Sequence, residues 1–517
     1  MDAFVRRMTE IRRASALVTL LGTCLVAGCR AEGDAGLAGG KATGPGNEGR
    51  PMVRIVTNGL NAIYPEGMDI NSNPYIESIR KHTNLDIRFT IPPSEGFDTK
   101  LNVIMASDDI PDLISTSNTN WFVHYVNRQA LMPLDELIDR HAPGLRKRFP
   151  QEAWDQVTVD GRIYAIPSLN EAPGGYLMYA RKDWLDRLGL QPPTTLDEYY
   201  AVMKAFAEQD PDGNGKDDTA GISIRENMGG ASPLFGAFGT QVSILAWHER
   251  DGRLVNGTVL PETKEALAFM AKLYKEKLLD QQFMLNKTAV FNEKIANGKI
   301  GLYAASWSDT RGPILDNRLN DPKAEWIPLD YPVGKDGRKG TSASQPVRYY
   351  SVVPAAAVNA AGAMKLLDFL SGEGYRDIKL GFENEIWTRT DGKMVINFAE
   401  HNKHFYRGVY SNLADIAEPG VTKDRLDGLG MPFRLNENLS RIGQNLIKSA
   451  FTGTTVPAMG LYGANLEKDM QETFTKIVAG ALPLSEFDAF VERWYKAGGE
   501  QMTAEVNAWY ESKNREK

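Results

Sequence analysis

The stretch that decides the fold class is VRIVTNGLNAIYPEGMDINSNPYIESIRKHTNLDIRFTI, residues 53–91. Residues 53–57 alternate apolar and polar side chains as a strand does, and residues 85–91 repeat that alternation. Between them, apolar residues recur at helical spacing over 75–79. A strand, a helix and a second strand in this order predict a parallel β-α-β unit with a right-handed crossover.

Strands and helices continue to alternate along the chain. Thr195 and Glu198 have the spacing of a capping box ahead of a long helix. Because strands alternate with helices, the pattern predicts an α/β fold with largely parallel sheets. Further strands are expected at 111–115 and 176–179, and helices at 97–105, 182–188, 199–209, 263–277, 361–370, 466–478, 484–496 and 501–512.

Composition and charge exclude several classes of protein. The 517 residues exceed what one hydrophobic core normally serves, which predicts at least two lobes. The net charge of -7 disfavours a nucleic-acid partner and a basic membrane-binding surface. The two cysteines are Cys24 and Cys29, so no residue after Cys29 forms a disulfide or a thiolate metal site.

The N-terminus has the charge order of an export signal. Four arginines precede an apolar stretch over 14–28, which is too short to span a bilayer comfortably. The stretch ends in LVAGC, residues 25–29, which resembles the lipobox of bacterial lipoproteins. The resemblance implies that residues 1–28 are a signal peptide and that Cys29 receives lipid of the palmitate type. The alternative is a plain signal peptide or a signal anchor with an incidental cysteine. The glycine-rich residues 29–50 are expected to form a flexible tether.

Several separated motifs resemble one family of binding proteins. They are ASDDIPDL at 106–113, DGRIYAIP at 160–167, YARKDWL at 179–185, NGKIG at 297–301 and KLLDF at 365–369. Together they resemble the bacterial extracellular solute-binding proteins of ABC importers, of family 1 type, including the Paenibacillus-like lipoproteins and the alginate- and oligosaccharide-binding relatives. One position departs from the family pattern, because Asn384 stands where relatives commonly carry glycine.

The resemblance implies a periplasmic-binding-protein-like fold of type II, in which a hinge joins two lobes. It implies a receptor without enzymatic activity that captures an oligosaccharide in the cleft and delivers it to a permease. The protein is then expected at the extracellular face of the cell membrane, held there by its N-terminal lipid. The expected lobes are discontinuous: lobe I comprises 51–170 and 345–425, and lobe II comprises 171–344 and 426–517.

Two other functions stay open. A polysaccharide-active enzyme would need a pair of carboxylates in the cleft. The chain has 66 acidic residues, and this number alone neither excludes nor supports such a pair. A surface receptor for a peptide or a signalling ligand would share the fold but not the transport.

The segment DPDGNGKDDT, residues 210–219, is the sharpest local motif. Its oxygen-bearing side chains and its glycine at the sixth position suit a loop wrapped around a hard cation. It resembles the calcium loop of alginate-binding relatives, although Thr219 replaces the usual glutamate. The alternative is a surface turn without metal. The ligands that the resemblance implies for a structural calcium ion are Asp210, Asp212, Asn214, Lys216 through its carbonyl, and Asp218.

Aromatic residues near predicted strand ends suggest a sugar-binding surface, because sugars stack their apolar faces on rings. For each ring, packing in a core is an equally good interpretation. His401 and His404 are three residues apart, a spacing that would suit two ligands of a metal ion. We expect them instead on an exposed polar surface. The candidate ligand-binding residues are Trp121, Trp307, Tyr349, Tyr350, Trp387 and Glu383.

Overall fold

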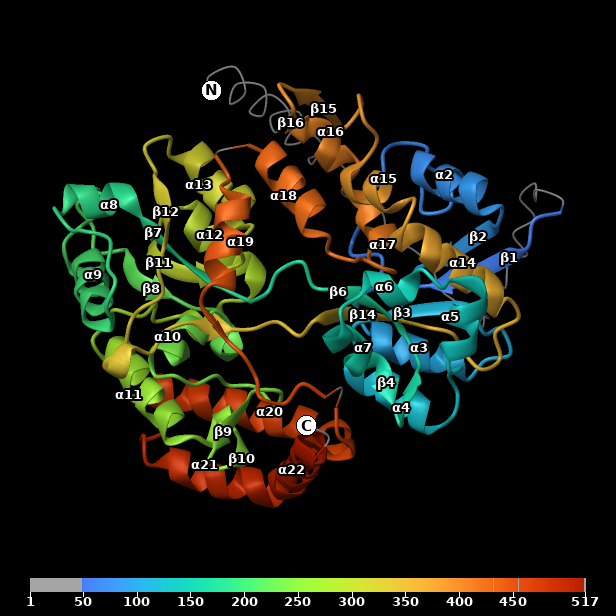
Figure 1. Ribbon diagram of the computed structural model, residues 1–517. Helices are drawn as coiled ribbons and strands as arrows, with labels where there is room; N and C mark the ends of the chain where they lie inside the picture. Colours follow the sequence, from blue (N-terminus) through green and yellow to red (C-terminus); the bar gives the residue numbers. More distant parts are fainter. Residues whose placement is uncertain (1–48, 431, 454, 516–517) are drawn as a thin grey trace, which may run out of the picture. The chain divides into compact units, whose positions relative to one another are not determined.

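Two mixed β-sheets organise the computed structural model, which describes residues 49–430, 432–453 and 455–515 (Figure 1). The predicted signal peptide 1–28, Cys29 and nearly all of the tether lie outside these residues. Residues 50–517 form one compact unit. The first sheet has the strand order β2 (Asp86–Thr90), β1 (Met52–Val56), β3 (Leu113–Thr116), β14 (Val347–Val352) and β6 (Ile166–Leu169). The second has the order β12 (Trp326–Leu329), β7 (Leu177–Arg181), β11 (Ile300–Ala305) and β8 (Ala220–Ser223).

The prediction of largely parallel sheets is correct for only part of each sheet. Strand β1 is parallel to β2, as the opening β-α-β unit predicted, and it is also parallel to β3. Strand β14 is antiparallel to both of its neighbours, and β7 is antiparallel to β11 and β12. Strands β7 and β14 each follow a segment that comes from the other sheet, so they start at the edge where the parallel strands end.

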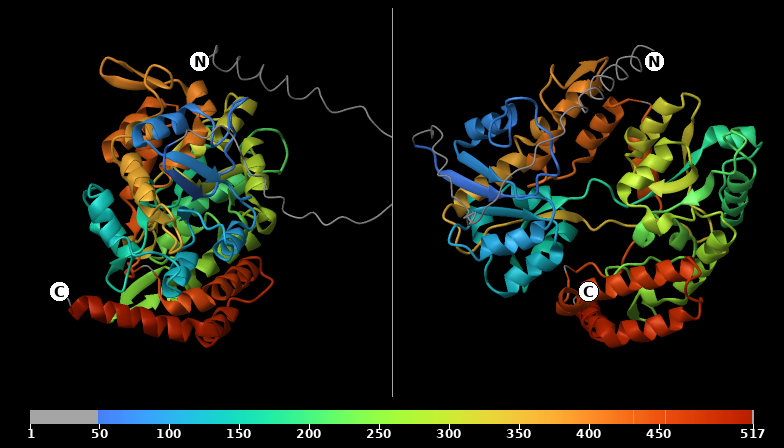
Figure 2. Two further views of the ribbon diagram at one scale, coloured as in Figure 1. Left: turned by 90° about the vertical axis from the view of Figure 1, so that its right-hand side faces the viewer. Right: turned by 180° about the vertical axis from the view of Figure 1, so that it is seen from behind.

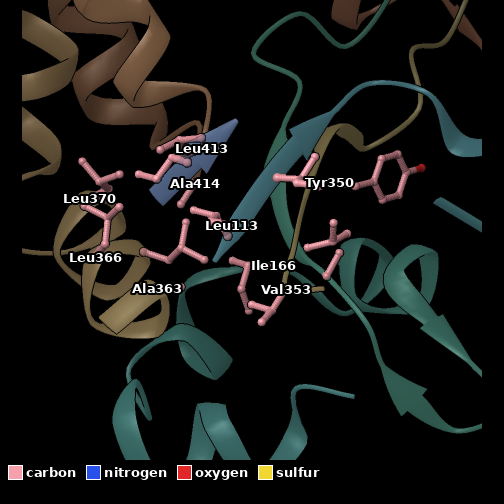
Figure 3. Packing of buried hydrophobic residues seen from close by; sticks show 14 of the residues in the cluster. Leu113, Ile166, Tyr350, Val353, Ala363, Leu366, Leu370, Leu413 and Ala414 are labelled. Atoms are coloured by element: carbon pink, nitrogen blue, oxygen red, sulfur yellow. The ribbon is translucent and has the colours of Figure 1, made fainter. Parts of the chain in front are cut away.

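Helices flank the first sheet and bury its apolar side chains. Asn73 caps the first helix by accepting hydrogen bonds from the backbone N–H groups of Tyr75 and Ile76. In Figure 3, Leu113 and Ile166 from the strands lie among side chains of α14, such as Leu366. The helices of this lobe are α2 (Pro74–Thr83), α3 (Phe97–Met105), α4 (Thr119–Asn127), α5 (Asp135–His141), α6 (Leu145–Arg148), α7 (Gln151–Val157) and α14 (Ala360–Ser371), with the hairpin β4 (Thr158–Val159) and β5 (Arg162–Ile163).

A second lobe surrounds the other sheet. Its core contains Trp184 and Trp494, which are both fully buried. The last three helices lie together with the hairpin β9–β10 (Figure 2). The elements of this lobe are α8 (Lys182–Arg187), α9 (Leu196–Glu208), α10 (Ser232–Ala237), β9 (Trp247–Arg250), β10 (Arg253–Asn256), α11 (Pro261–Lys275), α12 (Thr288–Ala296), α13 (Pro313–Asn320), α20 (Pro457–Val478), α21 (Glu486–Trp494) and α22 (Glu500–Arg515).

A third group of elements has a small core of its own, which includes Tyr375, Ile386 and Phe433. The sequence analysis predicted none of these elements. They are α15 (Tyr375–Leu380), β15 (Trp387–Thr390), β16 (Lys393–Ile396), α16 (Phe398–Lys403), α18 (Pro419–Gly428) and α19 (Leu435–Gly443). The helix α17 (Gly408–Ser411) packs into the first core through Tyr410. The short strand β13 (Thr341–Ser342) pairs with β17 (Leu446–Ile447). Short helical turns are η1 (Glu226–Met228), η2 (Gly257–Val259), η3 (Phe283–Leu285), η4 (Asp309–Arg311), η5 (Lys335–Gly337), η6 (Phe405–Arg407) and the π-type turn η7 (Tyr495–Gly499).

Two connecting segments join the sheets and are hydrogen-bonded to each other. Residues 170–176 lead from β6 to β7, and residues 330–346 lead from β12 to β14. Across them, Asn170 N donates to Pro346 O at 2.9 Å and Ser344 N donates to Pro173 O at 2.8 Å. The two segments therefore run side by side in opposite directions.

Candidate functional site

The candidate site lies at one edge of each sheet. At this edge of the first sheet β3 and β6 end and β14 begins. At the matching edge of the second sheet β8, β11 and β12 end and β7 begins. Only residues 170–176 separate the end of β6 from the start of β7, and a chain of this length reaches at most about 25 Å. The two edges are therefore tied close together, and the carboxyl ends of parallel strands are where α/β proteins commonly bind ligands.

On the second sheet, the edge carries the polar loop that follows β11. Trp307 in this loop is partly exposed and packs against two of the hydrophobic cores. Asn438 Nδ2 donates to the Trp307 carbonyl at 3.0 Å, and Thr310 Oγ1 donates to the carbonyl of Phe433 at 2.7 Å. These bonds fix the loop to the segment around α19, so Trp307 is held in place at the edge of the sheet.

On the first sheet, the predicted aromatic residues are mostly buried. Trp121 lies on α4 with 5% of its surface exposed, and its ring centroid is 4.4 Å from that of Tyr125. Tyr350 on β14 stacks on Phe122 at 4.8 Å, and its neighbour Tyr349 is also buried. The structure brings Trp121, Tyr349 and Tyr350 to the same lobe, whereas Trp307 belongs to the other sheet.

Trp387 and Glu383 lie away from both sheets, at the start of the hairpin β15–β16. Trp387 is buried in the third core, and its indole N–H donates to the carbonyl of Gly381 at 2.8 Å. Glu383 is exposed. Asn384 has a φ of 66°, which is the left-handed region that glycine and asparagine tolerate best. The loop therefore keeps a geometry that glycine would also adopt.

The expectation that His401 and His404 are exposed is wrong. His401 is 1% exposed and His404 is 7% exposed. Arg407 Nη2 lies 2.9 Å from His401 Nδ1, and the hydroxyl of Tyr75 lies 3.2 Å from His404 Nδ1. Burial, and then the nearby arginines, lower the pKa of His401 to about 2, so the ring is neutral. Their spacing placed both histidines on one face of a helix, but it could not show that Tyr75 of α2 and Arg407 cover that face.

The loop 210–219 gathers its acidic side chains around Asn214. Asn214 Nδ2 donates to Asp212 at 2.8 Å and to Asp218 at 3.1 Å, while the backbone N–H of Asn214 donates to Asp210 at 3.0 Å. Burial raises the pKa of Asp212, with the neighbouring carboxylates adding to that shift. A cavity of about 260 Å³ is lined by Asp210, Lys216 and neighbouring residues. Among the described residues, no group of three or more His, Cys, Asp or Glu side chains is arranged to hold a metal ion.

Buried charges lie where the first connecting segment meets α18. Glu171 accepts hydrogen bonds from Arg425 at 2.5 Å and from Thr422 at 3.0 Å, and Lys379 Nζ is 3.5 Å from it. Burial opposes ionisation of Glu171, but Arg425 and Lys379 lower its pKa to about 2. Lys379 also pairs with the buried Asp415 at 2.5 Å. The segment is thus held by a network of ion pairs.

Sequence reasoning missed three partly buried charged residues at the edge of the second sheet, namely Arg225 after β8 and Asp309 and Arg311 after β11. Burial raises the pKa of Asp309 to about 7, although the nearby Arg225 opposes the shift. The signal that could have found them is the polar run SWSDTR at 306–311, which follows the buried strand β11 directly.

Comparisons with known proteins agree with this architecture. The family model of bacterial extracellular solute-binding proteins matches residues 74–377. Lipoprotein LipO of Bacillus subtilis (strain 168) is 25% identical over 468 residues, covering 86% of this chain and 89% of LipO. The polygalacturonan/rhamnogalacturonan-binding protein YtcQ of the same organism is 27% identical over 450 residues, covering 83% and 86%.

Solved structures show the same fold. The alginate-binding protein AlgQ2 without calcium ion has a TM-score of 0.70 at 19% identity, covering 90% of this chain and 98% of AlgQ2. The substrate-binding protein FusA of Streptococcus pneumoniae in complex with kestose has a TM-score of 0.72 at 18% identity, covering 90% and 100%. The fold is therefore that of two-lobed, periplasmic-binding-protein-like receptors. No helix among the described residues is long and apolar enough to cross a membrane.

Proposed function

Because the chain belongs to the bacterial extracellular solute-binding proteins, we propose that it captures an oligosaccharide between its two lobes and delivers it to the permease of an ABC importer. The observation that carries the proposal is the pair of strand edges that the segment 170–176 ties together. Relatives whose names state polygalacturonan, rhamnogalacturonan or fructooligosaccharide binding support a carbohydrate as the ligand. The proposed lobes are 51–170 with 345–425 and 171–344 with 426–517.

Trp307 is the best supported of the proposed ligand contacts. It is partly exposed, lies at the edge of the second sheet and is fixed by the bond from Asn438. A sugar ring stacked on its indole would contribute about 1 kcal/mol beyond the buried area. Tyr349, Tyr350, Trp121, Trp387 and Glu383 are proposed contacts with less support, because all except Glu383 are buried.

The test is a thermal-shift and calorimetric screen of the purified protein against neutral and acidic oligosaccharides. A ligand at a hundred times its dissociation constant stabilises the folded state by about 2.7 kcal/mol. The bound sugar should be recovered unchanged, since a receptor breaks no bond. Cleaved sugar would favour the polysaccharide-active enzyme instead, and absence of binding to every oligosaccharide would contradict the proposal.

We also propose that the loop 210–219 binds a structural calcium ion. The carboxylates of Asp210, Asp212 and Asp218 all accept hydrogen bonds from Asn214, and a cation would relieve the repulsion that helps to raise the pKa of Asp212. Asn214 and the carbonyl of Lys216 would complete the set. When bound, the ion would brace the turn between α9 and β8, far from the strand edges.

Calcium added to protein treated with a chelator should raise Tm by several degrees. Asp212→Asn should abolish that rise, whereas Asp217→Asn, at an exposed neighbour outside the proposed set, should leave it intact. An unchanged Tm on addition of calcium to the wild-type protein would remove the proposal.

Cys29 is the proposed lipid anchor, which would hold the receptor at the extracellular face of the cell membrane. The name of the relative LipO, a lipoprotein, supports this. Expressed in a bacterium with a lipoprotein pathway, the wild-type protein should fractionate with membranes and Cys29→Ser should be soluble. Mature protein that still carries its first 28 residues would contradict the anchor.

A further inference from the structure

Arg311 is a partly buried cation that lacks a partner. Its Nε atom is buried and makes no hydrogen bond, and its side chain forms no ion pair within the described part of the chain. The guanidinium carbon lies 5.6 Å from the ring centroid of Phe398. A cation taken out of water without a counter-charge destabilises the folded state. The position is therefore costly unless something else supplies a negative charge.

The surroundings of Arg311 add positive charge. Arg425 and Arg407 are 8% and 4% exposed. Besides burial, Arg425 and Arg311 lower the pKa of Arg407, and all three arginines lower the pKa of the nearby His401. Burial first, and then Arg425, bring the pKa of Arg311 down to about 10. Arg407 donates only to the carbonyls of His401 and His404 and to the ring of His401.

The acids in this region do not balance these charges. Glu171 pairs with Arg425 and is shared with Lys379. Asp415 pairs with Lys379 at 2.5 Å. Among the described residues, no acidic side chain forms an ion pair with Arg311 or Arg407. The cluster therefore has more buried cations than anions.

A second arginine without an ion pair lies on the same sheet edge. Arg225 Nη2 donates to the hydroxyl of Tyr176 at 2.9 Å, and its guanidinium carbon is 5.4 Å from the Tyr176 ring centroid. The acid near it is Asp309, whose pKa burial raises to about 7, so that part of it is neutral at physiological pH. The loop with Trp307 thus carries Arg311 and lies next to the strand end that carries Arg225.

We propose that the captured oligosaccharide is acidic, and that Arg311, with Arg225 near it, binds the carboxylate of a uronic acid residue. This rests on the proposed function, and it deepens that function by naming the class of sugar. A guanidinium donates two parallel N–H bonds to a carboxylate, which favours this group over a neutral hydroxymethyl group. Trp307 on the same loop presents a ring on which the sugar would stack.

The test compares the trimer of galacturonic acid with its methyl ester, in which each carboxylate is replaced by an uncharged ester. Isothermal titration calorimetry with the full chain should give an affinity at least about tenfold higher for the acid than for the ester. Raising the salt concentration from 50 to 500 mM should weaken binding of the acid and leave binding of the ester unchanged.

Arg311→Gln should remove most of the preference for the acid over the ester. Arg318→Gln is the matched control, because it removes one arginine from α13, about two helical turns farther along the chain. The melting temperature of ligand-free Arg311→Gln should equal or exceed that of the wild-type protein, since the variant removes an unpaired cation. A drop of several degrees would indicate a structural role and contradict the proposal.

Two outcomes separate this inference from the function on which it rests. If the ester or a neutral oligosaccharide such as kestose binds as tightly as the acid, the acidic class is wrong while carbohydrate capture stands. If neither the uronate trimers nor any neutral oligosaccharide binds, carbohydrate capture itself fails, and the inference fails with it.

Discussion

At the scale of single residues, the candidate site differs most from what its sequence suggested. Asn384 could be predicted to depart from the family pattern, and its φ of 66° explains why asparagine is tolerated there. The burial of His401 and the missing partner of Arg311 could not be predicted, because both depend on elements distant in sequence. Side-chain type indicates which chemistry is available, but the surroundings of the side chain decide which chemistry occurs.

Asp309 should make stability depend on pH. Burial raises its pKa in the folded state to about 7, whereas in the unfolded state the carboxyl loses its proton near pH 4. Between these pH values the folded state therefore binds more protons than the unfolded state. Stability is therefore lost as pH rises from about 4 to about 7. Asp309→Asn should raise the free energy of unfolding by about 1 to 2 kcal/mol at pH 8, a value discounted for partial exposure, and by almost nothing at pH 4. Urea unfolding at both pH values measures this, with the exposed Asp336→Asn as control; equal effects at both pH values would contradict it.

His401 should act in the opposite direction. Its pKa of about 2 lies below the ordinary value, so only the unfolded state takes up a proton as pH falls below about 6.5. Through this residue, the free energy of unfolding of the wild-type protein should fall by about 2 kcal/mol between pH 6.5 and pH 5. His401→Gln keeps an acceptor for Arg407 and should flatten that decline, whereas the exposed His124→Gln should not. Thermal melts across this range decide between them.

At the scale of elements, local signals predicted local structure well. The helix α14 and the capping box before α9 both lie where the sequence predicted them. Local signals did not predict the antiparallel strand β14 or the helix α18. The partners of β14 come from parts of the chain more than 150 residues away, and α18 carries no marked apolar stripe.

Thr195 should contribute measurably to α9. Its hydroxyl accepts from the N–H of Glu198 at 3.2 Å, while the Glu198 carboxylate accepts from the N–H of Thr195 at 3.0 Å. Thr195→Ala should lower the free energy of unfolding by about 1 kcal/mol, and Thr195→Ser should largely preserve it. Denaturant unfolding of the three proteins tests this, and an alanine variant as stable as the wild type would show that the cap is energetically silent.

At the scale of the whole chain, length predicted two lobes and several separated motifs predicted the family, because both inferences use many residues at once. The ligand contacts could not be predicted in the same way. They depend on how the edges of two sheets meet, and residues such as Trp307 and Tyr350 come from different lobes.

Glu171 should be important for the stability of the junction between the lobes. Glu171→Gln leaves Arg425 and Lys379 without their shared anion, and breaking a buried ion pair in this way costs about 3 kcal/mol. Glu373→Gln, at an exposed position with no such role, should be nearly neutral. Equal melting temperatures for the two variants would contradict the importance of the network.

The paired backbone of residues 170–175 and 342–346 also limits how the receptor moves. Residues 341–343 also pair with 445–447, so three hydrogen-bonded chains lie side by side here, and such an arrangement bends more readily than its chains slide past one another. Opening and closing should therefore be a rotation of one lobe about these chains, with little translation of the lobes past each other.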